Sequence, residues 1–224
     1  MSSKSRLTNA RIVLASGNRG KIREMKHALA GLPVVIISLE DIGVTRTVEE
    51  KGRTFRENAR LKSVAYSLES DHLTLAEDSG LEVDHLHGAP GVYSARFSAP
   101  RATDQKNVRK VLRLMKRVPW GGRGARFVCH LVLARRGQVI KEVRGVVRGR
   151  IALAPKGDRG FGYDPVFYYA PLRRMFAELP ADLKNSVSHR GRALAKMRAY
   201  LSARLRRSAG AEKTGRRGPS PLRP

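Results

Sequence analysis

The sequence predicts an α/β fold built on a mixed sheet, and three patterns along the chain indicate it. Short apolar runs typical of buried strands alternate with amphipathic helical patterns over the first part of the chain. Two longer apolar segments, 125–134 and 138–147, flank Arg135-Arg136-Gly137 and predict an antiparallel hairpin. The early alternation favours parallel strands and the late hairpin adds antiparallel ones, so the sheet is expected to be mixed.

The first half of the chain supplies three predicted strands and two helices. Residues 11–16, 34–38 and 72–76 are short apolar runs, and each predicts a buried strand. Thr54 and Glu57 have the spacing of a capping box and predict the start of the second helix. The apolar face of the first helix comprises Ile22, Met25, Leu29 and Leu32. The apolar face of the second is expected to comprise Leu61, Val64, Ala65 and Leu68.

The second half adds a short strand, the hairpin and two further helices. Residues 81–86 alternate in polarity and are expected to form a separate fourth strand after an acidic loop. Thr103 begins a helix. The apolar sides of this helix and of the last one carry Val108, Val111, Leu112, Met115, Leu194, Met197, Leu201 and Leu205.

We expect a single folded domain over residues 11–207. The extension at 1–10 and the tail at 208–224 are expected to be disordered, the tail because it is basic and rich in Gly, Pro and Ser.

Composition limits the classes of function. Lys and Arg number 45 against 19 Asp and Glu, so the formal net charge is +26. Such a charge attracts nucleic acid or a multiply charged nucleotide, but an Arg-rich solvated surface has the same composition. The single cysteine, Cys129, excludes an internal disulfide framework and a Cys-based zinc site. The longest apolar run is too short for a membrane span and the start does not resemble a signal peptide, so we expect a cytoplasmic protein without a membrane partner.

The loop after the first strand has the pattern of an anion site. The segment LASGNRGK places a glycine turn between a predicted strand and a helix start, where backbone N–H groups and the helix dipole attract anions. Lys21 adds a cation. The loop is not a Walker A motif, because only two residues separate Gly17 from Gly20 and Ile22 stands where Ser or Thr would bind magnesium. A plain strand–helix turn is the alternative interpretation.

Carboxylates gather after the third predicted strand. Glu77, Asp78, Glu82 and Asp84 lie within eight residues, and the first two are expected where the strand ends in a loop. Ligands of α/β sheets bind at that edge, and adjacent carboxylates suit Mg²⁺, which bridges protein oxygens to phosphates. We therefore expect the acids to gather around Mg²⁺, although a solvated acidic turn is the alternative. Another loop carries a second acidic pair, at 49–50.

Two later segments carry aromatic and cationic side chains. In GFGYDP, at 160–165, an exposed Phe161 ring would be able to stack on a base; a turn closed by core aromatics is the alternative. In KNSVSHRG, at 184–191, the side chains of Lys184, His189 and Arg190 are possible donors to phosphate or to a base edge. A basic surface patch is the alternative interpretation.

In this order, the segments resemble the inosine/xanthosine triphosphate pyrophosphatase family, the house-cleaning nucleotide hydrolases. The matching segments, collinear from about residue 11 to 205, are LASGNRGK, TFRENARLKS, AEDSGLEVDHLHGAPGVYSAR, ATDQKN, GFGYDPVF and KNSVSHRGRAL. The resemblance implies an elongated α/β fold with two lobes flanking a deep nucleotide-binding cleft, usually as a homodimer. It also implies Mg²⁺-dependent hydrolysis of ITP, dITP or XTP to the monophosphate and pyrophosphate.

Individual roles follow from the resemblance as well. Asp78 matches the proton acceptor and a metal ligand, and Glu49 matches a second metal carboxylate, with Glu50 left as an alternative. The positions that match substrate contacts are Ser16, Gly17, Asn18, Arg19, Gly20, Lys21, Ser79, Phe161, Gly162, Tyr163, Asp164, Lys184, His189 and Arg190. Ser16 stands where Thr is usual, and Glu77 where bacterial relatives often have Asp, but both keep the functional group.

Two other functions compete with this one. A nucleic-acid-binding protein would account for the charge, but the chain has no recognisable helix-turn-helix, zinc finger or RNA-recognition motif, so no specific nucleic-acid partner is expected. A pyrophosphatase of the septum-formation-inhibitor type would prefer modified pyrimidines or dTTP. The SHRG segment, at 188–191, argues for the purine enzyme.

Overall fold

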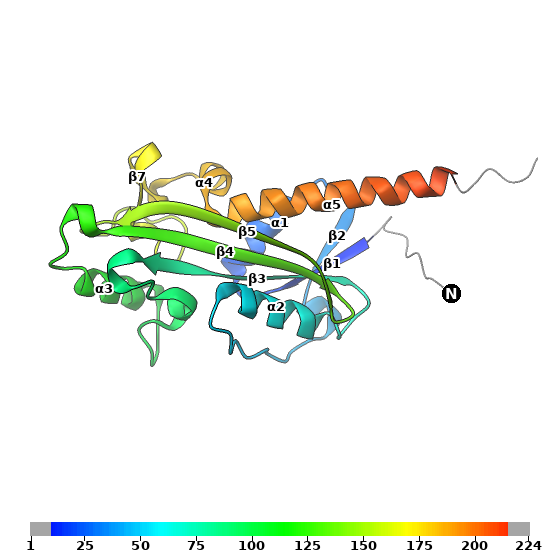
Figure 1. The fold of residues 1–224 in the computed structure, drawn as a ribbon, viewed down its shortest axis with the longest axis horizontal. Helices are drawn as coiled ribbons and strands as arrows, with labels where there is room; N and C mark the ends of the chain where they lie inside the picture. Colours follow the sequence, from blue (N-terminus) through cyan, green and yellow to red (C-terminus); the bar gives the residue numbers. More distant parts are fainter. Residues whose placement is uncertain (1–9, 215–224) are drawn as a thin grey trace, which may run out of the picture.

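Seven strands form one mixed sheet in the order β2-β1-β3-β4-β5-β6-β7, flanked by helices (Figure 1). The computed structural model describes residues 10–214, and its side chains as far as residue 207. The predicted α/β fold with a mixed sheet is confirmed. Its division into two lobes around a deep cleft stays a prediction. Residues 1–9 and 215–224, which belong to the two predicted extensions, lie outside the described part.

The parallel part of the sheet comes from the first half of the chain. β1 (Ala10–Ala15) pairs in parallel with β2 (Val34–Ser38) on one side and with β3 (Leu73–Val83) on the other. α1 (Arg19–Leu29) connects β1 to β2, and α2 (Phe55–Tyr66) precedes β3. The alternating apolar pattern predicted parallel strands connected by helices, and both strand–helix–strand units have this arrangement.

The antiparallel part is larger than predicted. β4 (Gly124–Arg135) and β5 (Gln138–Ile151) form the expected hairpin, which β6 (Phe167–Tyr169) and β7 (Arg174–Met175) extend.

The remaining helices are α3 (Asp104–Leu114), α4 (Ala181–Val187) and α5 (His189–Thr214). The backbone of α5 thus continues through the first residues of the predicted tail. No helix in the described part of the chain is long and apolar enough to cross a membrane.

β3 is one continuous strand, whereas the sequence predicted two strands separated by an acidic loop. Its parallel partner β1 ends opposite Ala76, but β4 continues to pair with β3 as far as Val83. The hydrogen bonds to β4 keep the acidic segment extended, so the predicted loop is wrong. Glu77 and Asp78 nevertheless lie just beyond the carboxyl end of β1, at the edge where the sequence placed them.

α2 buries a different face from the predicted one. Leu61 is 43% exposed and Leu68 is 66% exposed, so the predicted apolar face is wrong. The buried face comprises Phe55, Asn58, Ala59, Lys62, Ser63 and Tyr66, which recur at helical spacing. A hydrophobic pattern misses this face because two of its members, Asn58 and Lys62, are polar side chains with partners elsewhere in the fold.

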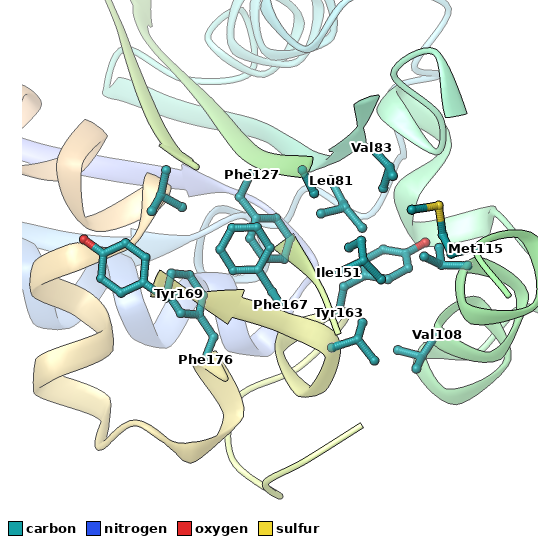
Figure 2. Packing of buried hydrophobic residues seen from close by; sticks show 14 of the residues in the cluster. Leu81, Val83, Val108, Met115, Phe127, Ile151, Tyr163, Phe167, Tyr169 and Phe176 are labelled. Atoms are coloured by element: carbon teal, nitrogen blue, oxygen red, sulfur yellow. The ribbon is translucent and has the colours of Figure 1, made fainter. Parts of the chain in front are cut away.

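The core has two main clusters, which lie on the same face of β3. One packs Leu73 and Leu75 of β3 against α1 and α5, and the other packs Leu81 and Val83 against α3 and the segment around Phe167. In the second cluster Phe127, Phe167 and Phe176 lie together at one end, while Tyr163 and Ile151 lie toward Met115 at the other (Figure 2). Glu77 and Ser79 occupy the stretch of β3 between the two clusters.

Candidate functional site

The two adjacent carboxylates of β3 point to opposite faces of the sheet, as strand geometry requires. Glu77 contacts Arg190 of α5, and Asp78 contacts Asn58 of α2. Glu82, farther along the strand, pairs with Arg126 of β4. The acids of this segment therefore have separate partners, and the expectation that they gather around one cation is wrong. Of Glu77, Asp78 and Glu82, it is Asp78 that lies near the acidic loop at 49–50.

On the α5 side, Glu77 is held in a buried ion pair with Arg190. The Nε and Nη2 atoms of Arg190 donate to the two oxygens of Glu77 at 2.7 and 2.8 Å. Ser79 Oγ donates to the same carboxylate at 2.6 Å, and Lys21 Nζ lies 3.4 Å from it. Burial opposes the charge, but Arg190 and Lys21 outweigh burial and hold the pKa of Glu77 far below its ordinary value. Glu77 is thus a fixed anion and a poor proton acceptor.

A third carboxylate, Glu24 of α1, extends this network. It accepts from Arg190 Nη1 at 2.5 Å and from Lys184 Nζ at 3.2 Å. Lys184 also donates to Asp164 at 2.6 Å. Sequence reasoning missed Glu24, because its partners come from the other end of the chain and no local pattern marks it.

The loop that carries Phe161 is closed over these cations. Asp164 accepts from the Phe161 N–H at 2.9 Å, and the Phe161 ring has its centroid 4.8 Å from Lys184 Nζ and 5.3 Å from Arg190 Cζ. A Cβ at Gly160, whose φ is +79°, would lie 2.1 Å from the Asp164 carboxylate, so a glycine is required there. Gly162 donates its N–H to Asp104 at the start of α3, at 2.7 Å.

A pocket opens beside this loop. Its lining includes Asn18, Lys21, Ser79, Gly80, Ser94, Ala95, Asp104, Phe127, Phe161, Gly162, Tyr163, Asp164, Lys184, His189 and Arg190. Most of the substrate positions that the sequence assigned thus meet around one pocket. Ser16, Gly17, Arg19 and Gly20 belong to the adjoining loop and not to this lining.

His189 and Tyr163 have different positions in this pocket. The His189 ring stacks on Phe127 with centroids 4.7 Å apart. Burial lowers the pKa of His189 well below its ordinary value, so the imidazole is neutral. Its Nδ1 is buried and has no hydrogen-bond partner among the described residues. Tyr163 instead lies in the core, and its hydroxyl donates to the Ser94 carbonyl at 2.8 Å, so it supports the loop.

The loop from Ser16 to Lys21 has the geometry of an anion site. Asn18 is the N-cap of α1, and its side chain accepts from the Lys21 N–H at 3.0 Å. The Asn18 N–H donates to Ser16 Oγ at 3.2 Å, which fixes the turn before the helix. The first turn of α1 contains no acidic residue, so its free N–H groups and Lys21 together favour an anion.

On the α2 side, Asp78 is a buried carboxylate with a different environment. Asn58 Nδ2 donates to it at 3.2 Å, and Lys62 Nζ lies 3.6 Å from its other oxygen. Burial raises the pKa of Asp78, the cations Lys62 and Lys21 oppose this, and Glu50 adds to it. The Gly52 N–H donates to Asn58 Oδ1 at 2.7 Å, which ties the acidic loop to the same helix. Sequence reasoning missed Asn58 and Lys62.

Of the two acids in the neighbouring loop, Glu50 is the one that shares a partner with Asp78. Lys62 Nζ lies 2.8 Å from Glu50 Oε1, so one ammonium group contacts both carboxylates. The Glu49 side chain is 75% exposed and pairs with Lys51. Within residues 10–207, no group of three or more His, Cys, Asp and Glu side chains is arranged to hold a metal. The pair of Glu50 and Asp78 fits a hard cation that takes its remaining ligands from water and phosphate.

Comparisons with known proteins give matches over most of the chain. A model of the Ham1 family matches residues 12–200. The dITP/XTP pyrophosphatase of Bacillus licheniformis is 44% identical over 190 residues, which cover 85% of this chain and 97% of that protein. The protein of the same name from Bacillus subtilis is 42% identical over 191 residues, which cover 85% of this chain and 96% of that protein.

Solved structures show the same similarity. A HAM1 protein from Coxiella burnetii matches with a TM-score of 0.80 and 38% identity, covering 87% of this chain and 99% of that one. The Ham1 protein of Staphylococcus aureus matches with a TM-score of 0.79 and 37% identity over the same shares of the two chains.

The buried ion pair gives a stability prediction. Glu77→Gln leaves the Arg190 guanidinium buried with one anion fewer, and breaking a buried pair costs about 3–5 kcal/mol. We expect the free energy of unfolding in urea at neutral pH to fall by that amount. Glu40→Gln, on an exposed side chain, is the matched control and should change it by no more than about 0.5 kcal/mol. An unchanged unfolding midpoint for Glu77→Gln would show that Arg190 does not depend on this carboxylate.

Proposed function

The chain belongs to the Ham1 family, and we propose that it hydrolyses dITP, ITP and XTP to the monophosphate and pyrophosphate. This activity removes deaminated purines from the nucleotide pool. The observation that carries the proposal is the pocket, which places an aromatic ring and a neutral imidazole beside an anion-binding loop. Lys21 of that loop also acts on the buried carboxylate of Asp78 across the sheet, whose pKa burial raises. A nucleoside triphosphate needs these groups together: a site for the base, one for the phosphates and a proton acceptor near a phosphorus.

The base is proposed to lie in the pocket against Phe161. Hypoxanthine and xanthine present a 6-keto acceptor, whereas adenine presents a 6-amino donor. The buried His189 Nδ1 has no partner among the described residues, so in the tautomer that carries hydrogen on Nδ1 it donates to the keto oxygen. An adenine would set donor against donor, and sites of this kind discriminate by about 10⁴-fold.

The phosphates are proposed to lie at the loop from Ser16 to Lys21. Backbone N–H groups at the start of α1 and the Lys21 ammonium offset the charge that develops on the leaving group. Asp78 accepts a proton from water, whose oxygen forms a bond to the α-phosphorus. The bond from this phosphorus to the bridging oxygen breaks, and pyrophosphate leaves.

We propose Mg²⁺ as the metal, held by Asp78 and one of the acids of the 49–50 loop. Two carboxylates together with water and phosphate oxygens form the ligand set that Mg²⁺ prefers. When bound, the metal would neutralise phosphate charge and act as a Lewis acid. The shared contact of Lys62 favours Glu50 over Glu49 as the second ligand. A homodimer in the cytoplasm is also proposed, on the family resemblance alone.

The first test is the product pattern. With Mg²⁺ present, the purified protein is expected to convert dITP, ITP and XTP to monophosphate and pyrophosphate, with ATP and GTP much poorer. Separate assays for pyrophosphate and orthophosphate, without coupling enzymes, check this. Orthophosphate as the first product would contradict attack at the α-phosphorus, and a preference for dTTP would favour the pyrimidine-directed alternative.

The second test concerns Asp78. Asp78→Asn keeps the shape of the side chain but removes its basicity, which for a general base is worth about 10²–10⁴-fold. We expect kcat for ITP to fall at least about a hundredfold. Because burial disfavours the carboxylate charge, the melting temperature without metal should hold or rise. Asp84→Asn, on an exposed side chain, is the control and should keep nearly full activity.

The third test separates the two acids of the loop. Glu50→Gln is expected to raise the Mg²⁺ concentration needed for half-maximal activity by about 10- to 100-fold, a loss typical of a removed metal-site partner. Glu49→Gln should change it by less than about threefold, since this side chain points to solvent and pairs with Lys51. The reverse result would assign the metal to Glu49 and show that the loop rearranges on binding.

A further inference from the structure

α3 and the turn after it carry a stripe of cations that the active site does not use. The six cations are Lys106, Arg109, Lys110, Arg113, Lys116 and Arg117. They recur every three or four residues, at 106, 109–110, 113 and 116–117, so they share one side of the helix and of the turn after it. The opposite side, with Val108 and Val111, is buried in the core. The stripe is therefore held on a fixed part of the fold.

None of these cations is neutralised by a neighbouring acid. No ion pair among the described residues involves any of the six. Lys106 and Lys110 each donate to a backbone carbonyl. The one acid of α3, Asp104, accepts from Gly162 on the loop of the pocket. The surface is thus strongly positive and open to solvent.

Helix stability alone does not account for this arrangement. Cations in the last turn of a helix interact favourably with its dipole, which explains Arg113 and the two cations after it. Lys106 lies in the first turn of α3, where the dipole disfavours positive charge, and Arg109 lies at the middle of the helix, where the dipole does not favour it. Like charges three or four residues apart also repel. A bound polyanion would remove both costs.

We propose that this stripe binds the phosphate backbone of nucleic acid without sequence preference. The helical residues 106–114 extend over about 13 Å, along which one DNA strand places about four phosphates. Trp120 follows the stripe, is 43% exposed, and has Arg150 over its ring at 5.4 Å. An exposed aromatic ring beside cations is typical of surfaces that bind single strands.

The geometry disfavours the other occupants of a basic surface. An amphipathic helix binds an anionic membrane by inserting its apolar side, but that side of α3 is buried against β3 and the segment around Phe167. A second copy of the chain docked through this face would set cations against cations. Nucleic acid needs only the charged side that α3 exposes.

The experiment measures binding of the full-length protein to a fluorescein-labelled single strand of about 20 nucleotides by anisotropy. The single Trp of the chain, Trp120, gives a second signal. The test variant is Arg109→Gln/Arg113→Gln/Arg117→Gln. The control variant, Arg148→Gln/Arg206→Gln/Arg207→Gln, removes the same charge from exposed positions on β5 and α5. Binding is measured from about 50 to about 200 mM salt.

We expect the test variant to lose about tenfold or more in affinity at about 0.1 M salt. Its slope of log affinity against log salt should fall by about two, since each contact to a single strand contributes about 0.7. The control should lose less than about threefold. Both variants should hydrolyse ITP as the parent does, which separates this result from any failure of the proposed activity.

Equal affinity for a duplex of the same length supports contact with the backbone alone, and tighter binding of the single strand supports a contact with Trp120.

Two outcomes would overturn the proposal. Equal losses in both variants would show that total charge, not α3, governs binding. Binding to phosphatidylserine vesicles that depends on α3, without binding to the oligonucleotide, would assign the stripe to a membrane surface.

Discussion

The alternation of side chains along one continuous strand is the constraint on which the site depends. On one face β3 presents Leu73, Leu75, Glu77, Ser79, Leu81 and Val83, so a polar pair lies between two apolar pairs. The apolar pairs belong to two separate clusters of the core, and of the polar pair Ser79 lines the pocket while Glu77 holds Arg190 of its lining. Asp78, one residue from Glu77, must face the other way. The strand therefore places a fixed anion on one side and the proposed proton acceptor on the other.

The scarcity of acids in this basic chain gives those in the site a clear role. Glu77, Glu24 and Asp164 are all buried or nearly so, and each contacts Arg190 or Lys184. Buried ion pairs contribute little net stability against well-packed apolar groups, but they fix the direction of the side chains that make them. In this site they hold two long, flexible cations beneath the Phe161 ring. The proposed base site is therefore preformed.

Local patterns predicted the parts of the fold that local interactions decide. The apolar face of α1, the Thr103 cap and the β4–β5 hairpin all follow from spacing or from short-range hydrogen bonds, and all are present. The continuity of β3 could not be predicted in this way, because its acidic half is held by β4, which lies about fifty residues later. The family resemblance named most pocket residues, but it assigned no role to Glu24, which the fold brings to Arg190 across 166 positions of sequence.

The buried face of α2 shows why a hydrophobic pattern fails at a functional site. Asn58 and Lys62 stand where such a face usually carries apolar residues, and each is buried with polar partners. Asn58 donates to Asp78 and accepts from the Gly52 N–H. Lys62 contacts both Asp78 and Glu50. A buried polar group without a partner would destabilise the fold, so these residues and the carboxylates require one another.

The same arrangement explains how two neighbouring carboxylates acquire opposite properties. Both are buried, which favours the neutral form of each. Arg190 makes two hydrogen bonds to Glu77 and decides its charge, whereas Lys62 stands at 3.6 Å from Asp78 and is shared with Glu50. Burial therefore prevails at Asp78 and raises its pKa, while the ion pair prevails at Glu77 and lowers it. Lys62, Lys21 and Asn58 oppose the effect of burial at Asp78 without outweighing it. A raised pKa is the property that the proposed role of Asp78 as proton acceptor requires.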